Sequence, residues 1–386
     1  LHPDADPGRP HLHLPLDQGT AVSQTHGRPR RILFAGYAPV HFVCFLPLYR
    51  RLARMARVEV FLSGGRSAGA EGEGAPMTAK ELYAPFRVPR GRVLELDAIR
   101  SRTFDLVFSA HVSGYFPREE KERIQLFHGV SFRNMAVRRD VLVYDRLFLT
   151  GPYMRRLFTE ERLLRSTDPR MVDIGFPKLD QLLDGTLDRG RILRRLGFSG
   201  RRPVILYAPT GQKDNSLEHT GEEVLKRLRA TGKYDILIKL HDHPRDRLTD
   251  WPARLRPLLD RHTRLAPGLD VVPYLFAADL LLTDASSVSN EYSLLDRPMV
   301  FLDVPQLLAA MDRKGVALDL DTWGRKGGIT ARWPDEAVEA VAWSLAHRRH
   351  ASAIRRDMAR DLFYNPGGAT TAALNWIRHR LDADEG

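Results

Sequence analysis

The sequence predicts an α/β protein with two doubly wound domains, and three observations support this. The chain has 386 residues, and at about 150 residues per domain this length favours two domains. Short apolar runs alternate with helix-forming segments in both halves, which is the pattern of parallel strands joined by helical crossovers. The breakers Gly197 and Gly200 precede a new apolar strand at Val204, so we place the junction between the domains at 185–200.

The N-terminal domain is expected at 29–190. Residues 1–28, which lack periodicity and the basic-then-apolar layout of a signal peptide, are expected to form a flexible leader. The glycine-rich stretch 64–76 predicts an irregular, flexible loop. The expected strands are 32–35, 58–62, 93–96, 105–109, 124–127 and 147–150, with a helix at 42–55.

The C-terminal domain is expected at 200–367, followed by a closing helix within 368–386. Apolar residues in 369–381 recur at helical spacing and predict an amphipathic helix. Ligands of such paired sheets bind where the carboxyl ends of the strands meet the crevice between the halves, so candidate site residues should follow strands. The expected strands are 204–207, 235–240, 262–265, 280–283 and 299–302, with helices near 219–231, 286–295 and 335–348.

Composition excludes several classes of protein. Hydrophobic residues make up 43% and charged residues 28%, as in folded globular proteins. The longest apolar run, Phe42–Tyr49, is interrupted by Pro47 and is far shorter than the roughly 18 residues of a membrane-spanning helix. The single cysteine, Cys44, cannot form an internal disulfide or a thiolate cluster, which indicates a reduced, cytoplasmic setting.

The net charge of +11 favours anionic partners such as nucleotides, phosphates, nucleic acid or an acidic membrane surface. The basic residues come as scattered pairs, for example Arg50-Arg51 and Arg355-Arg356, and not as one tail, so no nucleic acid partner is expected. Two interpretations stay open at this point: an ordinary solvated basic surface, and a patch that faces a membrane or a polymer.

The first candidate for chemistry is His128, because the expected strand 124–127 ends directly in His128-Gly129. A side chain at this position faces the crevice, and Gly129 allows a ligand to approach the backbone closely. An imidazole is well suited to take a proton from an attacking hydroxyl near neutral pH. The alternative is a histidine that bonds a backbone carbonyl in a turn.

A second cluster follows the expected strand 235–240, where Lys239, His241, His243 and Arg245 lie within one short segment. These donors could hold a pyrophosphate. His241 and His243 share a face of an extended chain and could instead bind a metal, but no nearby acidic pair or cysteine completes a ligand set, so no metal is expected. A polar strand exit with surface histidines is the third interpretation.

A third candidate is the turn after the expected strand 280–283. Asp284 or Ser286 could cap the following helix, and its N–H groups, with the Ser286 and Ser287 hydroxyls, would then bind phosphate. Glu291 could accept a ribose or alditol hydroxyl. The alternative is an ordinary capped helix.

A weaker candidate follows the strand 204–207, where Thr210 and Lys213 could contact phosphate or simply belong to a connecting loop. Neither a Gly-x-Gly-x-x-Gly turn nor a Gly-Lys-Ser/Thr loop occurs in the sequence. Dinucleotide-dependent dehydrogenases and P-loop ATPases are therefore disfavoured.

Taken together and in this order, the motifs resemble the CDP-glycerol glycerophosphotransferase family, the teichoic-acid polymerases and primases with a two-domain GT-B fold. The similarity covers roughly residues 100–375 and is weak in the N-terminal third. The stretches that carry it are Phe127-His128-Gly129-Val130-Ser131, Leu206-Tyr207-Ala208-Pro209-Thr210, His243-Pro244, Leu282-Thr283-Asp284-Ala285-Ser286-Ser287-Val288 with Glu291-Tyr292 and Asp296-Arg297-Pro298, and Gly367-Gly368-Ala369.

The resemblance implies two Rossmann-like domains, an N-terminal acceptor side and a C-terminal nucleotide-donor side, that face a central crevice. It implies that His128 is the base on the acceptor hydroxyl, and that His243 with Ser286 and Ser287 holds the CDP pyrophosphate. His243 is favoured over His241 because a proline follows it, as in the family. The contact of Glu291 with the nucleotide ribose is a further implication.

Two departures from the family pattern affect the expected pockets. Gly211-Gln212-Lys213 stands where the family has Trp-Arg, so Lys213 would have to supply the donor contact there. Val130-Ser131 replaces Thr-Pro after the His-Gly pair, which alters the acceptor side, where we also expect His41, Gly129 and Ser131.

We therefore expect a transferase without metal or other cofactor that moves an alditol phosphate from a CDP-alditol to a hydroxyl of a glycan or lipid-linked acceptor and releases CMP. It would act in the synthesis of a cell-envelope polymer, as a cytoplasmic protein at the inner face of the membrane. The alternatives are a GT-B nucleotide-sugar glycosyltransferase or sugar-nucleotide epimerase, and a non-catalytic module that binds a polyanion.

Overall fold

The structure is a computed structural model, and most of the expected leader and of the expected loop at 64–76 lies outside the part of the chain that it describes. The sequence-based domain limits, 29–190 and 200–367, stay predictions; the two sheets occupy 30–173 and 204–331. The described residues are 28–65, 77–110, 116–117, 119–130, 137–241, 249–314 and 322–383.

The first sheet has six parallel strands in the order β2-β1-β3-β4-β5-β6. The chain leaves β1 toward one edge and returns on its other side with β3, which creates a topological switch point where ligands of doubly wound folds bind. Ser109 of β3 pairs with Gln125 of β4, so the segments that follow these two strands start side by side. The strands are β1 Arg30–Gly36, β2 Val58–Gly64, β3 Thr103–Ser109, β4 Glu119–Leu126, β5 Arg146–Leu149 and β6 Met171–Asp173.

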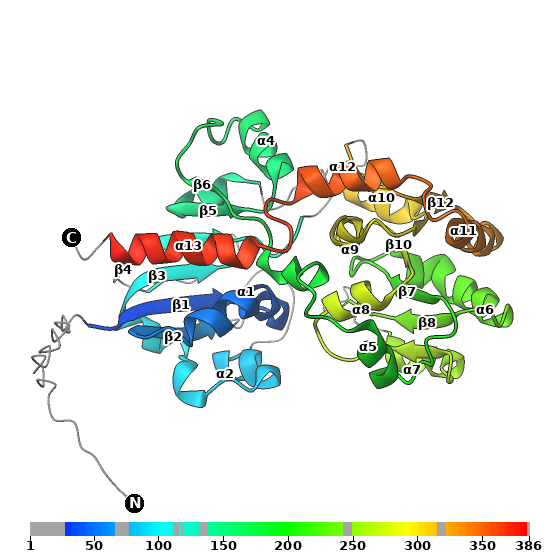
Figure 1. The fold of residues 1–386 in the computed structure, drawn as a ribbon, viewed down its shortest axis with the longest axis horizontal. Helices are drawn as coiled ribbons and strands as arrows, with labels where there is room; N and C mark the ends of the chain where they lie inside the picture. The colour runs from blue at the N-terminus through cyan, green and yellow to red at the C-terminus, as the bar shows by residue number, and fades with distance from the viewer. Residues whose placement is uncertain are drawn as a thin grey trace, which may run out of the picture.

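The second sheet repeats this design with the order β12-β11-β10-β7-β8-β9, again all parallel. Its central strands are continuous apolar runs because helices cover both faces of the sheet (Figure 1). Thr283 of β10 pairs with Ala208 of β7, so the turns after these strands are neighbours. The strands are β7 Val204–Ala208, β8 Asp235–Ile238, β9 Thr263–Leu265, β10 Leu280–Thr283, β11 Met299–Leu302 and β12 Ile329–Ala331.

Helices fill the crossovers, and none in the described part of the chain is long and apolar enough to cross a membrane. The α-helices are α1 Pro39–Leu52, α2 Ala79–Tyr83, α3 Leu96–Arg100, α4 Pro152–Glu160, α5 Arg189–Arg195, α6 Glu222–Ala230, α7 Trp251–Leu255, α8 Val272–Ala277, α9 Val288–Tyr292, α10 Pro305–Arg313, α11 Pro334–Ala346, α12 Ser352–Leu362 and α13 Ala369–Asp382. The 3-10 turns are η1 Ala84–Phe86, η2 Arg90–Arg92, η3 Arg139–Val143, η4 Pro177–Leu182, η6 Arg256–Leu258 and η7 Ser293–Leu295, and a π-helical turn, η5, spans Leu217–Gly221.

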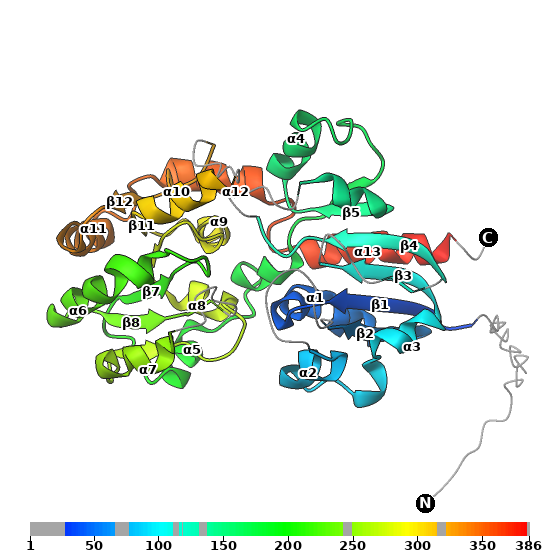
Figure 2. The same ribbon diagram turned by 180° about the vertical axis from the view of Figure 1, so that it is seen from behind.

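The last two helices carry the chain from the second sheet back to the first. Helix α13 lies along the first sheet in both ribbon views (Figures 1 and 2), where Ala373 and Ile377 join the same buried cluster as Phe34 of β1. Asp180 of η4 holds the start of α13, because its carboxylate oxygens accept the backbone N–H groups of Ala369 and Thr370 at 3.0 and 2.7 Å.

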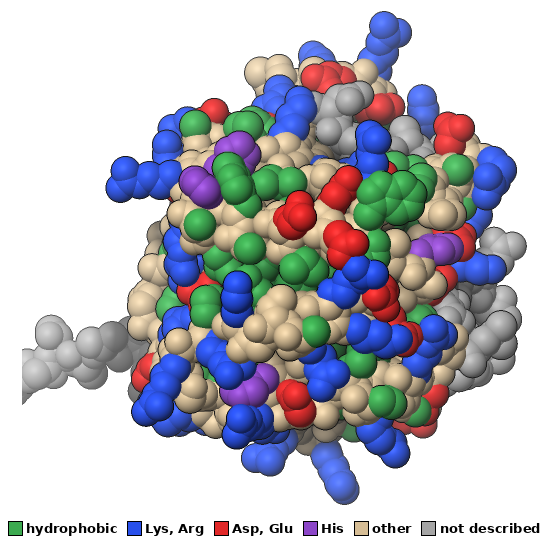
Figure 3. All heavy atoms as spheres, turned by 90° about the vertical axis from the view of Figure 1, so that its right-hand side faces the viewer, with side chains coloured by type: hydrophobic (Ala, Val, Ile, Leu, Met, Phe, Trp, Pro, Cys, Tyr) green, Lys and Arg blue, Asp and Glu red, His purple; other side chains and the backbone are tan. Residues whose placement is uncertain are grey.

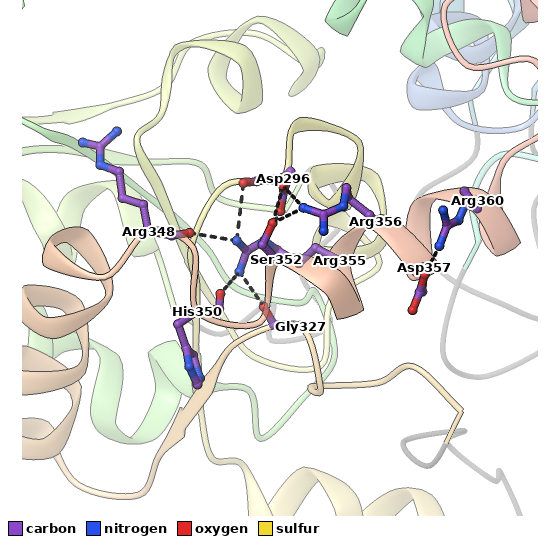
Figure 4. Close-up of polar contacts among 9 residues, drawn as sticks. All are labelled: Asp296, Gly327, Arg348, His350, Ser352, Arg355, Arg356, Asp357 and Arg360. Carbon is purple, nitrogen blue, oxygen red and sulfur yellow. Dashed lines mark hydrogen bonds and ion pairs between the residues drawn. The ribbon is translucent and has the colours of Figure 1, made fainter.

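Helix α12 is fixed at both ends. At its start, Arg355 is almost fully buried and donates to the Asp296 carboxylate and to the carbonyls of Gly327 and His350 (Figure 4). Near its other end, Asp361 accepts from Arg156 of α4 at 2.7 Å. The Asp296 turn and helix α4 are thus joined through one rigid helix.

Buried apolar side chains from both halves of the chain form one continuous cluster. It includes Cys44 and Phe176 from the first half together with Leu206, Leu281 and Tyr292 from the second. Because burial of apolar surface is the main favourable term in such contacts, this shared cluster holds the two halves together.

The α/β class with two doubly wound sheets is confirmed, but three details of the sequence-based prediction are wrong. No strand forms at 93–96: Val93 makes only an isolated bridge to Leu62, and the Glu95 carboxylate accepts the first N–H groups of α2. The strand expected at 235–240 ends at Ile238. The strands β6 and β12 were not expected, since three residues are too short for a recognisable pattern.

Candidate active site

His128 follows β4 at the carboxyl edge of the first sheet and exposes its side chain. Its Nδ1 lies 2.6 Å from the carbonyl oxygen of Ala110, which continues from the neighbouring strand β3. A carbonyl only accepts, so Nδ1 carries the proton and Nε2 is the basic nitrogen of the ring. The carbonyl contact weighed as an alternative thus exists, and it fixes the orientation of the imidazole ring. A side chain at Gly129 would meet only open space.

His41 lies directly behind His128. It is buried in α1, its ring centroid is 4.9 Å from that of His128, and Tyr37 donates its backbone N–H to Nδ1 at 3.4 Å. A Cβ at Gly36, the last residue of β1, would lie only 3.0 Å from the Cβ of His41, so this glycine allows the close approach. The structure therefore brings His41 close to His128 and to the neighbouring Gly129.

Asp284 has a different orientation from the one expected. It is fully buried after β10, and its Oδ1 accepts the Thr210 N–H at 2.8 Å. Its Oδ2 accepts both the N–H and the hydroxyl of Ser216, at 3.0 and 2.8 Å. Burial raises the pKa of this carboxyl, and the three donors work against that rise. Asp284 therefore shapes the loop after β7.

The expected helix cap is also wrong. Helix α9 begins after Ser287, which has helical backbone angles, and no side chain caps the helix. Asp284 is directed to the neighbouring loop, and the carbonyl of Ser286 accepts the Ser289 hydroxyl at 2.8 Å. Ser286 is buried and Ser287 is partly buried beside this one-turn helix.

A pocket of about 370 Å³ opens at the carboxyl ends of β7, β8 and β9. Its polar wall includes Thr210, Lys239 and His241, whereas Trp251 and Leu265 belong to its apolar wall. Lys239 is buried and donates to the Leu240 carbonyl at 2.9 Å. The remaining lining residues are Pro209, Asn215, Leu217, Ile238, Leu240, Thr249, Pro252, Ala266 and Gly268.

Gly211 and Lys213 lie in the loop that follows β7, next to this pocket. A Cβ at Gly211 would lie 2.4 Å from the His241 ring, so the glycine is required for the histidine to reach the pocket wall. Lys213 is exposed and does not belong to the pocket lining. The sequence-predicted residues Ser131, His243 and Arg245 lie outside the described residues.

Glu291 does not present its carboxylate for a ribose hydroxyl in this structure. Both of its oxygens accept from the Lys178 ammonium at 3.0 Å, and the two side chains are 3% and 7% exposed. Burial alone would lower the pKa of Lys178, but the adjacent Glu291 carboxylate outweighs this effect and the pKa is raised. The Lys178 ammonium is therefore charged at neutral pH.

Sequence reasoning missed Lys178 and Asn290. Lys178 follows the unrecognised strand β6, and Asn290 donates its side-chain N–H to the Val130 carbonyl at 2.9 Å. The pattern Gly175-Phe176-Pro177-Lys178, a glycine and proline turn with a cation, was the available signal for Lys178. Among the described residues, no group of three or more His, Cys, Asp or Glu side chains could hold a metal ion.

Two doubly wound parallel sheets of six strands each form the architecture of the GT-B class of two-domain α/β proteins. Solved structures show the same fold. The wall teichoic acid polymerase TagF aligns with a TM-score of 0.66 at 16% identity, covering 92% of this chain and 90% of that chain. A UDP-N-acetylglucosamine 2-epimerase aligns with a TM-score of 0.55 at 12% identity, covering 92% and 96%.

The family follows from the sequence. Residues 95–366 match the family described as CDP-glycerol:poly(glycerophosphate) glycerophosphotransferase, and the chain belongs to this family. The teichoic acid poly(glycerol phosphate) polymerase of Bacillus subtilis (strain 168) is 27% identical over 219 residues, 51% of this chain and 26% of the relative. The teichoic acid glycerol-phosphate primase of the same strain is 27% identical over 162 residues, 41% and 39%. The matches therefore span less than half of these relatives.

Proposed function

We propose that this protein transfers glycerol phosphate from CDP-glycerol to a hydroxyl of a glycan or lipid-linked acceptor, with release of CMP, in the synthesis of a cell-envelope polymer. Family membership supports the CDP-alditol donor. The observation that carries the proposal is the pairing of His128, exposed at the end of β4, with a pocket at the strand ends of the second sheet.

The pocket suits the nucleotide of the donor. Its apolar wall, including Trp251 and Leu265, would receive the base, while Thr210, Lys239 and His241 on the polar wall would face the ribose and phosphates. Lys213, Arg245 and His243, which the sequence places after the same strands, would add charge near the pyrophosphate. These cationic groups would neutralise the charge of the donor phosphates without a metal ion.

The reaction balances without a further reactant. His128 Nε2 takes the proton of the acceptor hydroxyl as its oxygen forms a bond to the phosphorus that carries glycerol. The bond from that phosphorus to the bridging oxygen breaks, and CMP leaves with the oxygen and its electron pair. Lys239 and the serines 286 and 287 would stabilise the departing charge. Alignment of the two substrates across the crevice supplies much of the acceleration.

A lipid-linked acceptor would bring the protein to the inner face of the membrane as a peripheral protein. The net charge of +11 supports attraction to an anionic surface. On the face at the α6 and α11 end of the molecule, Lys and Arg side chains are spread among acidic and apolar ones (Figure 3), so that face has the character of a solvated surface.

The test is a CMP-release assay with CDP-glycerol, CDP-ribitol and UDP-sugars as donors. The acceptors are a poly(glycerol phosphate) oligomer and a solubilised membrane-lipid extract. We expect acceptor-dependent CMP release that is lost in His128→Ala while the variant still binds CDP-glycerol in calorimetry. Release of UDP from a UDP-sugar, with no turnover of either CDP-alditol, would instead establish the glycosyltransferase alternative.

A further inference from the structure

Helix α9 touches the segment that carries His128. Asn290 is 2% exposed and donates its side-chain N–H to the Val130 carbonyl at 2.9 Å, although 160 residues separate the two positions. Val130 is two residues after His128. A buried hydrogen bond therefore connects helix α9 to the backbone next to the proposed base, His128.

The next residue on the same helix makes a second contact of this kind. Glu291 forms the buried ion pair with Lys178, which lies in η4 at the end of the first half of the chain. A buried charge without its partner is costly, so this pair fixes the position of α9 relative to η4. Cys44 belongs to the apolar cluster shared by the two halves, and its thiol donates to the His128 carbonyl at 3.8 Å.

We propose that Lys178, Asn290 and Glu291 act as positioning residues that hold the His128 segment at the correct distance from the donor pocket. We call these three residues the α9 clamp. This inference rests on the proposed function. The apolar cluster shared by the two halves holds them together without specifying direction, since apolar contacts are non-directional, whereas the clamp contacts have fixed geometry.

The expected consequence is kinetic. A displacement of about 1 Å at the reacting groups lowers the rate about 100-fold, whereas His128 is not among the residues that line the nucleotide pocket. Loss of the clamp should therefore lower kcat about 10- to 100-fold and leave the KM for CDP-glycerol within about twofold. A residue with only a structural role would lower the amount of folded enzyme without changing kcat per folded molecule.

The main variant is Asn290→Leu, which has a similar volume and removes the donor to Val130. The matched control is Ser293→Ala on the neighbouring turn, where a buried hydroxyl bonds only the local Asn290 carbonyl at 2.7 Å. A second variant, Lys178→Met with Glu291→Met, removes both charges together and so avoids an unpaired buried ion. The single variant Lys178→Arg keeps the cation beside Glu291 and should retain most of the wild-type kcat.

Steady-state CMP release gives kcat and KM, and hydrogen exchange of the peptide 119–130 gives a readout that needs no activity. We expect faster exchange at residues 128–130 in Asn290→Leu and unchanged exchange in the β7 peptide 204–208. Wild-type kcat in both clamp variants, or an equal loss of kcat in Ser293→Ala, would overturn the positioning role of the α9 clamp. If the unsubstituted protein releases no CMP, the proposed function fails, and unchanged exchange at 128–130 would then overturn the clamp independently.

Discussion

Replacement of Asp284 by alanine should both destabilise the protein and weaken donor binding. The carboxylate accepts three buried hydrogen bonds, one from Thr210 and two from Ser216. Each donor left without a partner costs about 1–3 kcal/mol. The loss of the carboxylate also removes the free-energy cost of its burial, which offsets part of this destabilisation. We expect a net loss of about 2–4 kcal/mol in the free energy of unfolding.

The same substitution frees the loop that forms one wall of the pocket, so the Kd for CDP-glycerol should rise at least about tenfold, or about 1.4 kcal/mol. Urea denaturation and calorimetry measure the two effects, with the exposed Asp312→Ala as the control. Burial raises the folded pKa of Asp284, so its contribution to stability is greatest below the unfolded pKa and is lost as pH rises through the folded value. The advantage of wild type over Asp284→Ala should therefore shrink as the pH rises above about 4, the usual pKa of an unfolded aspartate. Unchanged stability and binding would refute this account.

Three further predictions follow from single contacts. Asp180→Ala removes the acceptor at the start of α13 and should cost about 1–2 kcal/mol in urea unfolding; a loss no larger than that of Asp312→Ala would contradict this. Gly211→Ala should displace the His241 ring and weaken CDP-glycerol binding in calorimetry without lowering the melting temperature. Wild-type affinity in this variant would show that the His241 ring does not contact the bound donor. Burial raises the pKa of Cys44 to about 12, so a chromogenic disulfide reagent should react with it only after denaturant is added; rapid reaction of the native protein would disprove its burial.

Local sequence patterns predicted most of the fold because strands buried on both faces are continuous apolar runs. The strands β7, β10 and β11 were located nearly residue by residue in this way. The same logic placed His128 and Asp284 at strand ends. The three-residue strands β6 and β12 were missed, since so short a run does not differ from a loop.

The sequence by itself determined the paired α/β design, the family and the presence of a histidine and a polar turn at strand ends. It did not determine the direction of the side chains there. Asp284 and Glu291 were expected to face a ligand, but each meets donors contributed by segments 68 to 113 residues away, Ser216 and Lys178. A buried carboxylate must pair with whichever donors the fold brings to it, and only tertiary structure decides which donors those are.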